Sequence, residues 1–247
     1  MEKFVIDGGT ALSGTIVPER AVPPSMTNFS MRGGPPGAEA EPEGWARVTA
    51  MPSRISREEA LSLLCDWVQS DSLRRHCLAV EAAMVAYARR DGHDAELWGV
   101  TGLLHDADYE RFPDMDDAEH GHPRTIMAEL QRRDAPPEIV RAIASHADYL
   151  GVPPRTPMER TLVAVDELCG FLVACAYVRP EGIHGLTPKS VRKKLKQPSF
   201  AAAVDREDVR GGADQLGVGF DEHVAFVIAA LEARADELGL HGRAPLQ

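Results

Sequence analysis

Residues 102–110 of the chain read Gly-Leu-Leu-His-Asp-Ala-Asp-Tyr-Glu and follow an apolar run that begins at Leu97. The run has the character of a core helix, yet it ends in an adjacent imidazole and carboxylate, those of His105 and Asp106. Burying both groups is costly unless something pairs with them, and a bound cation is the simplest partner for both. The stretch therefore predicts a metal site at the end of a buried helix.

The sequence on both sides of this stretch predicts helices from residue 53 onward. The expected ranges are 56–70, 72–90, 94–105, 121–133, 137–146, 156–178, a basic helix over about 187–196, 205–215 and 221–238. The segment Thr156–Glu159 combines a capping residue, a first-turn proline and a capping-box glutamate, which is typical of a helix start. The helix after it is apolar on almost every side, which indicates a place in the middle of the domain. No alternating strand pattern appears over 53–240, so we expect an all-α bundle.

The first part of the chain differs in composition. Between Glu19 and Ala50 it is rich in proline and glycine, and such a segment cannot bury enough apolar surface to offset its ordering entropy. We expect a mostly disordered or loosely attached extension over 1–52, a domain over 53–240 and a tail over 241–247. Residues 1–18 resemble the first strands of UDP-N-acetylglucosamine enolpyruvyl transferases, but nothing after them fits that enzyme, and Met51 is an alternative start.

Composition excludes several classes of function. The chain has 247 residues and a formal net charge of -11, which argues against a general nucleic-acid binder and against binding to anionic membranes. Its four cysteines lie at no metal-like spacing, and no run of about 18 apolar residues appears. We expect a cytoplasmic protein without a membrane partner, whose reduced thiols pack in the core.

Further side chains able to bind a metal lie beside apolar helix faces or at helix ends. They are His76, His122, His146 and Asp166, and together with His105 and Asp106 they come from five expected helices. Asp166 lies within an apolar helix, where an acid needs a partner that its sequence neighbours do not supply. A single histidine is more often an ordinary residue, so the metal hypothesis rests on the set.

The remaining histidines are poorer candidates. His93 lies in a polar turn, His223 opens the last expected helix and His241 lies in the tail. We expect all three to be ordinary surface residues.

The order of the candidate ligands resembles the H…HD…D signature of the HD-domain superfamily of metal-dependent phosphohydrolases. His76, the pair His105-Asp106 and Asp166 match this signature, while His122 and His146 resemble the two further histidines of its dinuclear members. The resemblance covers about residues 56–238. Three segments are also similar to a bacterial subgroup described only as predicted HD hydrolases, namely Leu103–Glu110, Asp166–Leu168 and Lys189–Lys196. The resemblance implies an all-α HD-domain bundle and little about the substrate.

For the metal site, the resemblance implies that His76, His105, Asp106 and Asp166 hold one ion, and that His122 and His146 add the ligands of a second. One or two divalent ions are expected, and nitrogen and carboxylate ligands suit Mn, Fe, Mg, Co or Zn. Only one of His120 and His122 is expected to coordinate, and the spacing to His146 favours His122. Thr125 stands where the family often has glycine, so its side chain would crowd the second ion.

For the reaction, the resemblance implies hydrolysis of a phosphomonoester or phosphodiester of a small molecule, with a nucleotide as one candidate, by a metal-activated water. The candidate catalytic residues are Asp106, Asp108 and Glu110, of which the last two would orient the water or the imidazoles. Lys189, Arg192 and Lys193 share one face of the basic helix and are the candidates for binding phosphate. Otherwise these acids and bases are solvated surface groups.

Other functions remain open from the sequence. Some HD-domain proteins with the same ligand types are mixed-valent di-iron oxygenases, and iron content with oxygen dependence would separate them from a hydrolase. A metal-dependent esterase and a non-catalytic nucleotide-binding module are further alternatives. A small-molecule phosphoester is the expected partner, and a homodimer is compatible with the sequence.

Overall fold

The computed structural model describes residues 55–242, and this part of the chain is helical throughout, without a strand. The helices are α1 (Arg57–Trp67), α2 (Asp71–Asp91), α3 (Ala95–Leu104), α4 (Arg124–Arg132), α5 (Pro137–His146), α6 (Pro157–Tyr177), α7 (Pro188–Leu195), α8 (Arg206–Leu216), α9 (Phe220–Glu232) and α10 (Ala235–Leu238), with a 3-10 turn, η1 (Asp148–Leu150). The all-α prediction is confirmed. The expected extension, its boundary at residue 53 and the start at Met51 lie outside the described residues and stay predictions.

Local sequence signals explain most helix ends. Thr156 caps α6 through the predicted capping box, and Ser56 caps α1 in the same way. Helix α4 begins three residues later than expected, after its N-cap Pro123, and the N–H of His122 bonds outside the helix to Phe112 O. The expected helix 221–238 is wrong as one element. The N–H of Arg234 bonds three residues back to Leu231 O, so α9 tightens and ends before α10 begins.

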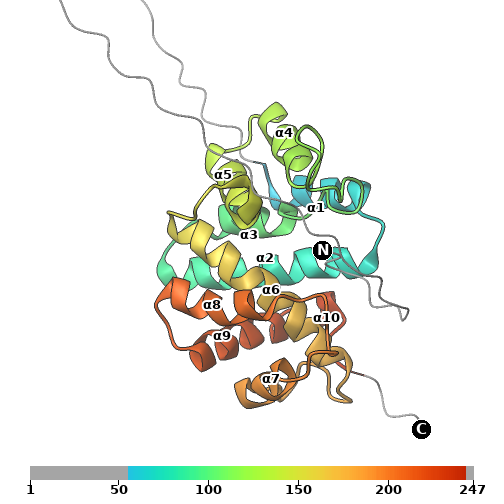
Figure 1. Ribbon diagram of the computed structural model, residues 1–247, viewed down its shortest axis with the longest axis vertical. Helices are drawn as coiled ribbons and strands as arrows, with labels where there is room; N and C mark the ends of the chain where they lie inside the picture. Colours follow the sequence, from blue (N-terminus) through green and yellow to red (C-terminus); the bar gives the residue numbers. More distant parts are fainter. Residues whose placement is uncertain (1–54, 243–247) are drawn as a thin grey trace, which may run out of the picture. The chain divides into compact units, whose positions relative to one another are not determined.

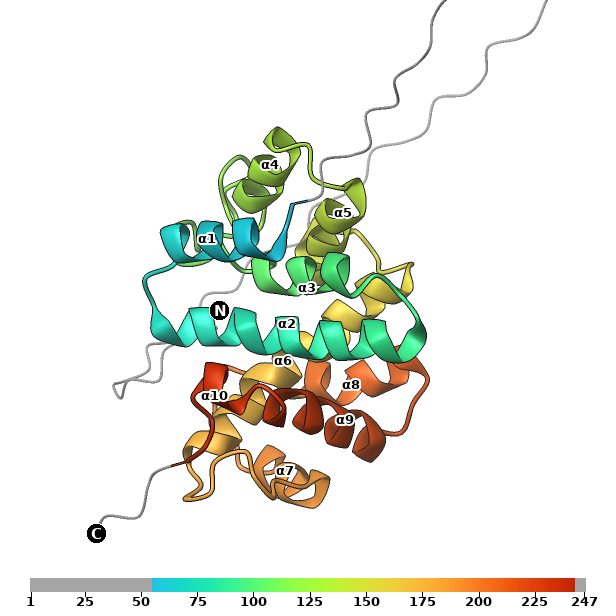
Figure 2. The ribbon, with the colours of Figure 1, turned by 180° about the vertical axis from the view of Figure 1, so that it is seen from behind.

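Helices α2 and α6, each 21 residues long, pack against each other in the middle of this helical body. In Figure 1, α1, α3, α4 and α5 lie on one side of α2, whereas α7, α8, α9 and α10 lie on the other. Figure 2 shows the same division from behind. The two long helices therefore separate two groups of shorter ones.

Each group of shorter helices has its own apolar core. One core holds side chains of α1, α3, α4 and α5, and the other holds side chains of α6 to α10. Helix α2 contributes to both, with Leu73 and Cys77 in the first and Val80 and Met84 in the second. His76 is buried on the same helix, next to Cys77 of the first core.

Glycine allows α3 to approach α2 closely. A Cβ atom built on Gly102 would lie 3.0 Å from the backbone nitrogen of Glu81 and 3.0 Å from Met84 Cγ, closer than real Cβ contacts usually come. Because the residue has no side chain, the last turn of α3 packs directly on α2. This contact sets His105, which follows α3, near His76.

Ion pairs with a buried acid of α2 also connect segments that are far apart in the sequence. The Glu81 carboxylate, 2% exposed, pairs with Arg57 of α1 and, at 3.1 Å, with Arg234 beside α10. Both arginines also pair with Glu237 of α10. The beginning and the end of the described chain are thus held to one helix in the middle.

Three of the four cysteines are buried in the helical body. Cys77, Cys169 and Cys175 are buried as expected, but Cys65 is exposed because it lies on the outer face of α1. Among residues 55–242, no helix has both the length and the apolar character needed to span a membrane.

Candidate metal centre

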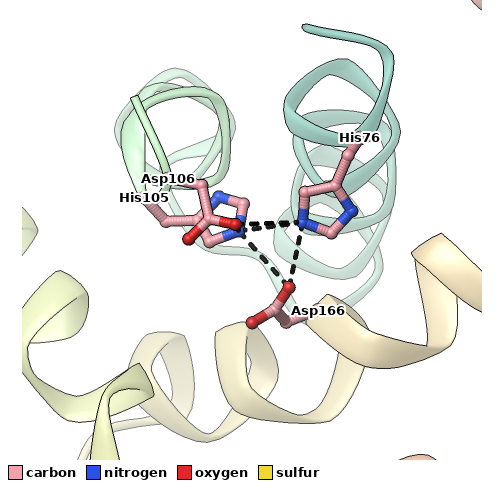
Figure 3. A group of neighbouring side chains, drawn as sticks. All are labelled: His76, His105, Asp106 and Asp166. Carbon is pink, nitrogen blue, oxygen red and sulfur yellow. Dashed lines mark hydrogen bonds and ion pairs between the residues drawn. The ribbon is translucent and has the colours of Figure 1, made fainter. Parts of the chain in front are cut away.

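Four of the predicted ligands form one buried group, drawn in Figure 3. His76 comes from α2, His105 and Asp106 follow α3, and Asp166 comes from α6. The Nε2 atoms of His76 and His105 lie 3.1 Å apart, and Asp166 Oδ1 lies 3.0 and 3.3 Å from them. Each of the four offers one ligand atom within 4.8 Å of the others. The elements on both sides of α2 thus supply one compact set of nitrogen and oxygen atoms.

A second group shares Asp106 with the first. The Nε2 atoms of His122 and His146 each lie 3.3 Å from Asp106 Oδ1. The other oxygen, Asp106 Oδ2, lies 3.6 Å from His76 Nε2 and 3.5 Å from His105 Nε2. One carboxylate therefore faces both groups, one oxygen to each, as expected of an acid that bridges two cations.

Hydrogen bonds fix which nitrogen of three imidazoles points into the cluster. The Nδ1 atom of His105 lies 2.8 Å from Gly102 O, that of His146 lies 2.5 Å from Ile143 O, and that of His122 lies 2.7 Å from Asp108 Oδ1. Carbonyl and carboxylate oxygens only accept, so Nδ1 carries the hydrogen in each ring. In the neutral imidazole, Nε2 then presents a lone pair to the cluster, which is the arrangement of a metal-binding histidine.

Several polar atoms of the cluster are buried without a hydrogen-bond partner. Asp106 is 0% exposed, and within the described part of the chain neither of its oxygens, nor His146 Nε2, has a hydrogen bond. A buried carboxylate without donors is costly unless it coordinates a cation. The donor set and its orphaned atoms therefore fit a divalent metal with nitrogen and oxygen ligands.

The charges of the cluster favour a cation, although without a metal His105 holds a proton on Nε2 that a bound cation would replace. Burial acts to lower the pKa of His105, but the carboxylates of Asp106 and Asp166 overcome it and raise the pKa to about 9. Burial acts to raise the pKa of Asp106, yet the neighbouring imidazoles of His105, His146 and His122 hold it well below its ordinary value. Burial also lowers the pKa of His146. The carboxylate of Asp106 is therefore ionised, and it attracts positive charge to the cluster.

Two side chains hold His122. Asp108 is fully buried, accepts from His122 Nδ1 through Oδ1, and accepts from the backbone N–H of Ile126 at 2.9 Å through Oδ2. The hydroxyl of Tyr149 donates to the backbone oxygen of His122. Asp108 therefore lies beside the imidazole of His122, where the predicted orienting role would place it, and Tyr149 is a further contact of His122 that the sequence did not reveal.

The structure distinguishes His122 from its neighbour His120. The side chain of His120 is 60% exposed and lies beside Asp117 and Glu119, whereas that of His122 is 2% exposed. The hydroxyl of Thr125 donates to the backbone oxygen of His120. Because Thr125 turns that way, it does not crowd the second group as expected.

Glu110 does not join the cluster, contrary to the catalytic role predicted for it. Its exposed carboxylate accepts from the backbone N–H groups of Gln69 and Ser70, both at 2.9 Å, just before α2. Glu110 therefore accepts hydrogen bonds from the backbone N–H groups that lead into α2.

The basic helix also lies away from the cluster, so the phosphate site predicted at Lys189, Arg192 and Lys193 is wrong for this cluster. Helix α7 packs on α6 and α9, at the opposite end of the helical body from α4 and α5 in Figures 1 and 2. The guanidinium of Arg192 pairs with Asp221 at 2.6 Å. The sequence showed that these bases share a helix face but did not show which elements that face meets.

His223 is not the surface residue that we expected. It is 0% exposed, Tyr87 lies 2.6 Å from its Nδ1, and its Nε2 donates to Ala164 O at 3.1 Å. Burial lowers the pKa of His223. The signal was present in the sequence, because His223 falls on the apolar face that Val224, Val227 and Ile228 form at helical spacing.

A pocket of about 760 Å³ opens beside the cluster. Three of the candidate ligands line it, namely His122, His146 and Asp166. Its other lining residues are Met115, residues of the segment 145–154, residues of α6, and residues of α8 and its N-cap Asp205. A small molecule in this pocket would therefore reach the cluster.

Comparison with known proteins agrees with this arrangement. A model of the HD domain family matches residues 73–169, a range that contains all six candidate ligands. No curated protein and no solved structure matches the chain. The helical fold and the clustered His and Asp side chains fit the matched family, and the match over residues 73–169 supports the resemblance to the HD-domain superfamily.

Proposed function

We propose that this protein is a metal-dependent phosphohydrolase that cleaves a phosphomonoester or phosphodiester of a small molecule. The observation that carries the proposal is the shared position of Asp106 between two groups of ligands. In each group a carboxylate and histidines converge, and the six side chains are His76, His105, Asp106, His122, His146 and Asp166. These residues would hold one or two divalent ions.

A divalent pair bound there would lower the pKa of a water molecule and stabilise the oxygens of an in-line displacement. The protein's own residues perform the positioning. Asp108 fixes the ring of His122, and the carbonyls of Gly102 and Ile143 fix the rings of His105 and His146. Rings fixed in this way keep their lone pairs directed at the cluster without reorganisation during the reaction.

The pocket supports a small-molecule substrate rather than a macromolecular one. Its volume of about 760 Å³ is that of a site for one small ligand. A cytoplasmic location stays part of the proposal, and the four free thiols agree with a reducing compartment.

A di-iron oxygenase would use the same kinds of ligand, so the test must measure both metal and reaction. We would purify the protein and its Asp106→Ala, His122→Ala and His120→Ala variants. Metal content would be determined by elemental analysis. Phosphomonoesters and phosphodiesters would be screened with Mn, Mg, Co, Zn and Fe, with and without oxygen.

We expect the unchanged protein to bind up to two ions and to hydrolyse a phosphoester without oxygen. Asp106→Ala should lose metal and activity, because the side chain faces both groups. His122→Ala should lose one ion, whereas His120→Ala, at an exposed neighbouring histidine, should behave as the unchanged protein. Iron with oxygen-dependent turnover and no phosphoester cleavage would show the oxygenase instead, and retention of metal by Asp106→Ala would remove the basis of the proposal.

A further inference from the structure

We infer that His223 is an acid-sensitive link, which holds α9 to α2 and α6 while its ring is neutral and loosens when the ring gains a proton. The link consists of three residues from three helices, namely Tyr87 of α2, Ala164 of α6 and His223 of α9. The side chains of Tyr87 and His223 are both 0% exposed. None of the three residues is a candidate metal ligand, so the inference does not depend on the proposed function.

Hydrogen bonds fix the tautomer of His223. Its Nε2 atom lies 3.1 Å from Ala164 O, and a carbonyl oxygen only accepts, so Nε2 carries the hydrogen. Its Nδ1 atom lies 2.6 Å from the hydroxyl oxygen of Tyr87, and that hydroxyl donates to the lone pair of the neutral ring. The neutral imidazole therefore has one donor and one acceptor to place, and both have a partner inside the core.

A second proton on His223 would remove this match. Nδ1 would become a donor, and the hydroxyl of Tyr87 would have to turn its own hydrogen away from the ring. The imidazolium would also be buried, where a charge is costly unless an opposite charge lies beside it. The link therefore favours the neutral ring for as long as α9 stays packed on α2 and α6.

The charged groups of α2 add to this cost. The guanidinium of Arg90 lies over the ring of Tyr87, 4.5 Å from its centroid, and its charge opposes a second positive charge on His223. Asp91 pairs with Arg90 at 2.6 Å. Burial raises the pKa of Tyr87 to about 12, so the hydroxyl keeps its hydrogen. Burial, aided by Arg90, lowers the pKa of His223 although the bond to Ala164 O opposes this shift.

The other elements of the described chain supply no carboxylate to the ring of His223. The two thiols of α6 in this core, those of Cys169 and Cys175, are neutral because burial raises the pKa of each. The acids beside His223 on its own helix, Asp221 and Glu222, are exposed, and Asp221 pairs with Arg192 of α7. The buried side chains that α7, α8 and α10 add to the core are apolar, namely Val191, Leu195, Val209, Ala235 and Leu238.

Acid should therefore weaken the packing of α9. Above about pH 6.5, the ordinary pKa of histidine, His223 is neutral in the folded and in the unfolded protein, and the link contributes fully. As the pH falls below this value, the unfolded chain binds a proton at His223 that the folded protein does not bind. At about pH 5.5 this residue alone would raise the unfolding constant by up to about tenfold.

NMR spectroscopy of the isotope-labelled full chain tests the state of the ring. We expect His223 to carry its hydrogen on Nε2, with both ring nitrogen shifts constant between about pH 7.5 and about pH 5.5. The histidines of the same protein unfolded in urea are the reference, and their shifts should move over this range. Shifts of His223 that move together with the reference would overturn the inference.

Urea unfolding at the same two pH values measures the contribution of the link. We expect the acid-induced rise in the unfolding constant to be about three- to tenfold smaller in His223→Gln than in the unchanged protein. Tyr87→Phe is the matched control, because it removes the hydroxyl but keeps a buried imidazole. It should be less stable at both pH values and retain the rise. Contributions common to the three proteins, including those of the metal cluster, cancel, and an equal rise in His223→Gln and the unchanged protein would contradict the link.

Hydrogen exchange locates the loosening. After correction for the intrinsic rate at each pH, the protection of α9 relative to α1 should fall about threefold or more on acidification of the unchanged protein, and it should not fall in His223→Gln. An equal loss of protection in both helices would show that acid does not act through α9. None of these measurements uses a phosphoester, so their outcome is separate from that of the proposed function.

Discussion

Asp108 shows how one buried side chain supports the candidate metal site without belonging to it. Its two oxygens accept from two N–H groups, one on the ring of His122 and one on the backbone at Ile126. A carboxylate serves both donors at once, and its charge strengthens the bond to the imidazole. The orientation of His122 therefore depends on a residue that coordinates nothing.

Replacing Asp108 by asparagine should weaken metal binding by about 10- to 100-fold. Asparagine has one acceptor oxygen for two donors, so either His122 or Ile126 would face an NH₂ group. Competition with a metal chelator would measure the affinity. Asp116→Asn, at an exposed acid in the same loop, is the matched control and should leave the affinity unchanged. Equal affinities for the two variants would show that Asp108 does not orient His122.

Among individual residues, the side chains that form the cluster were easier to predict from the sequence than the residues around them. The clustering of the six candidate ligands could be predicted because imidazoles and carboxylates beside apolar residues are costly without a partner. Glu110 could not be excluded, since the backbone N–H groups that it meets lie about 40 positions earlier in the chain, at Gln69 and Ser70. Tyr149 acts through a backbone oxygen, and such a contact leaves no signal in the sequence.

Among the helices, the contact of α6 with α8 depends on the absence of one side chain. A Cβ atom on Gly212 would lie 2.6 Å from Ala164 O and 2.9 Å from Ala164 Cα. Both atoms belong to the backbone of α6, two residues before Asp166, and neither can rotate away. The two helices would have to separate to admit even a methyl group.

Gly212→Ala should therefore lower the free energy of unfolding by about 1–3 kcal/mol. The control lies one residue earlier, because a Cβ atom on Gly211 would meet nothing within 4 Å. Gly211→Ala should raise the stability by about 0.5–1 kcal/mol, since alanine loses less entropy in a helix than glycine does. Denaturant unfolding of both variants measures the difference. A stability for Gly212→Ala equal to that for Gly211→Ala would contradict the close contact.

Helices were easier to predict than the contacts between them. The apolar spacing and the capping residues set the bounds of α1, α2 and α6 within a few residues, because both effects are local. The break between α9 and α10 and the position of α7 depend on contacts with other helices. A basic face was therefore identified correctly on α7 and assigned to the wrong neighbours.

For the molecule as a whole, Glu81 links the beginning and the end of the described chain. Its carboxylate is 2% exposed and pairs with Arg57 and Arg234, which come from either end. Removing one member of a buried ion pair leaves the other members without compensation. Arg57 is 43% exposed, so water can solvate it in part and reduce the loss.

We expect Glu81→Gln to lower the free energy of unfolding by about 2–3 kcal/mol. Glu237→Gln removes an acid that contacts the same two arginines but is 40% exposed, and it should cost about 0–1 kcal/mol. Thermal unfolding of the two variants tests the comparison. Similar melting temperatures would mean that burial of Glu81 does not set the strength of this link.

The shared carboxylate of Asp106 also restricts which of the six candidate ligands can be substituted during evolution. Loss of His122 or His146 removes ligands from one group and leaves the four members of the other. If the site holds two ions as proposed, substitution of either histidine would be expected to leave a site for one. No such outcome is expected at Asp106, because a single substitution there removes a ligand from both groups in one step. Of the six candidate ligands, Asp106 is therefore the one whose substitution we expect to disturb both groups at once.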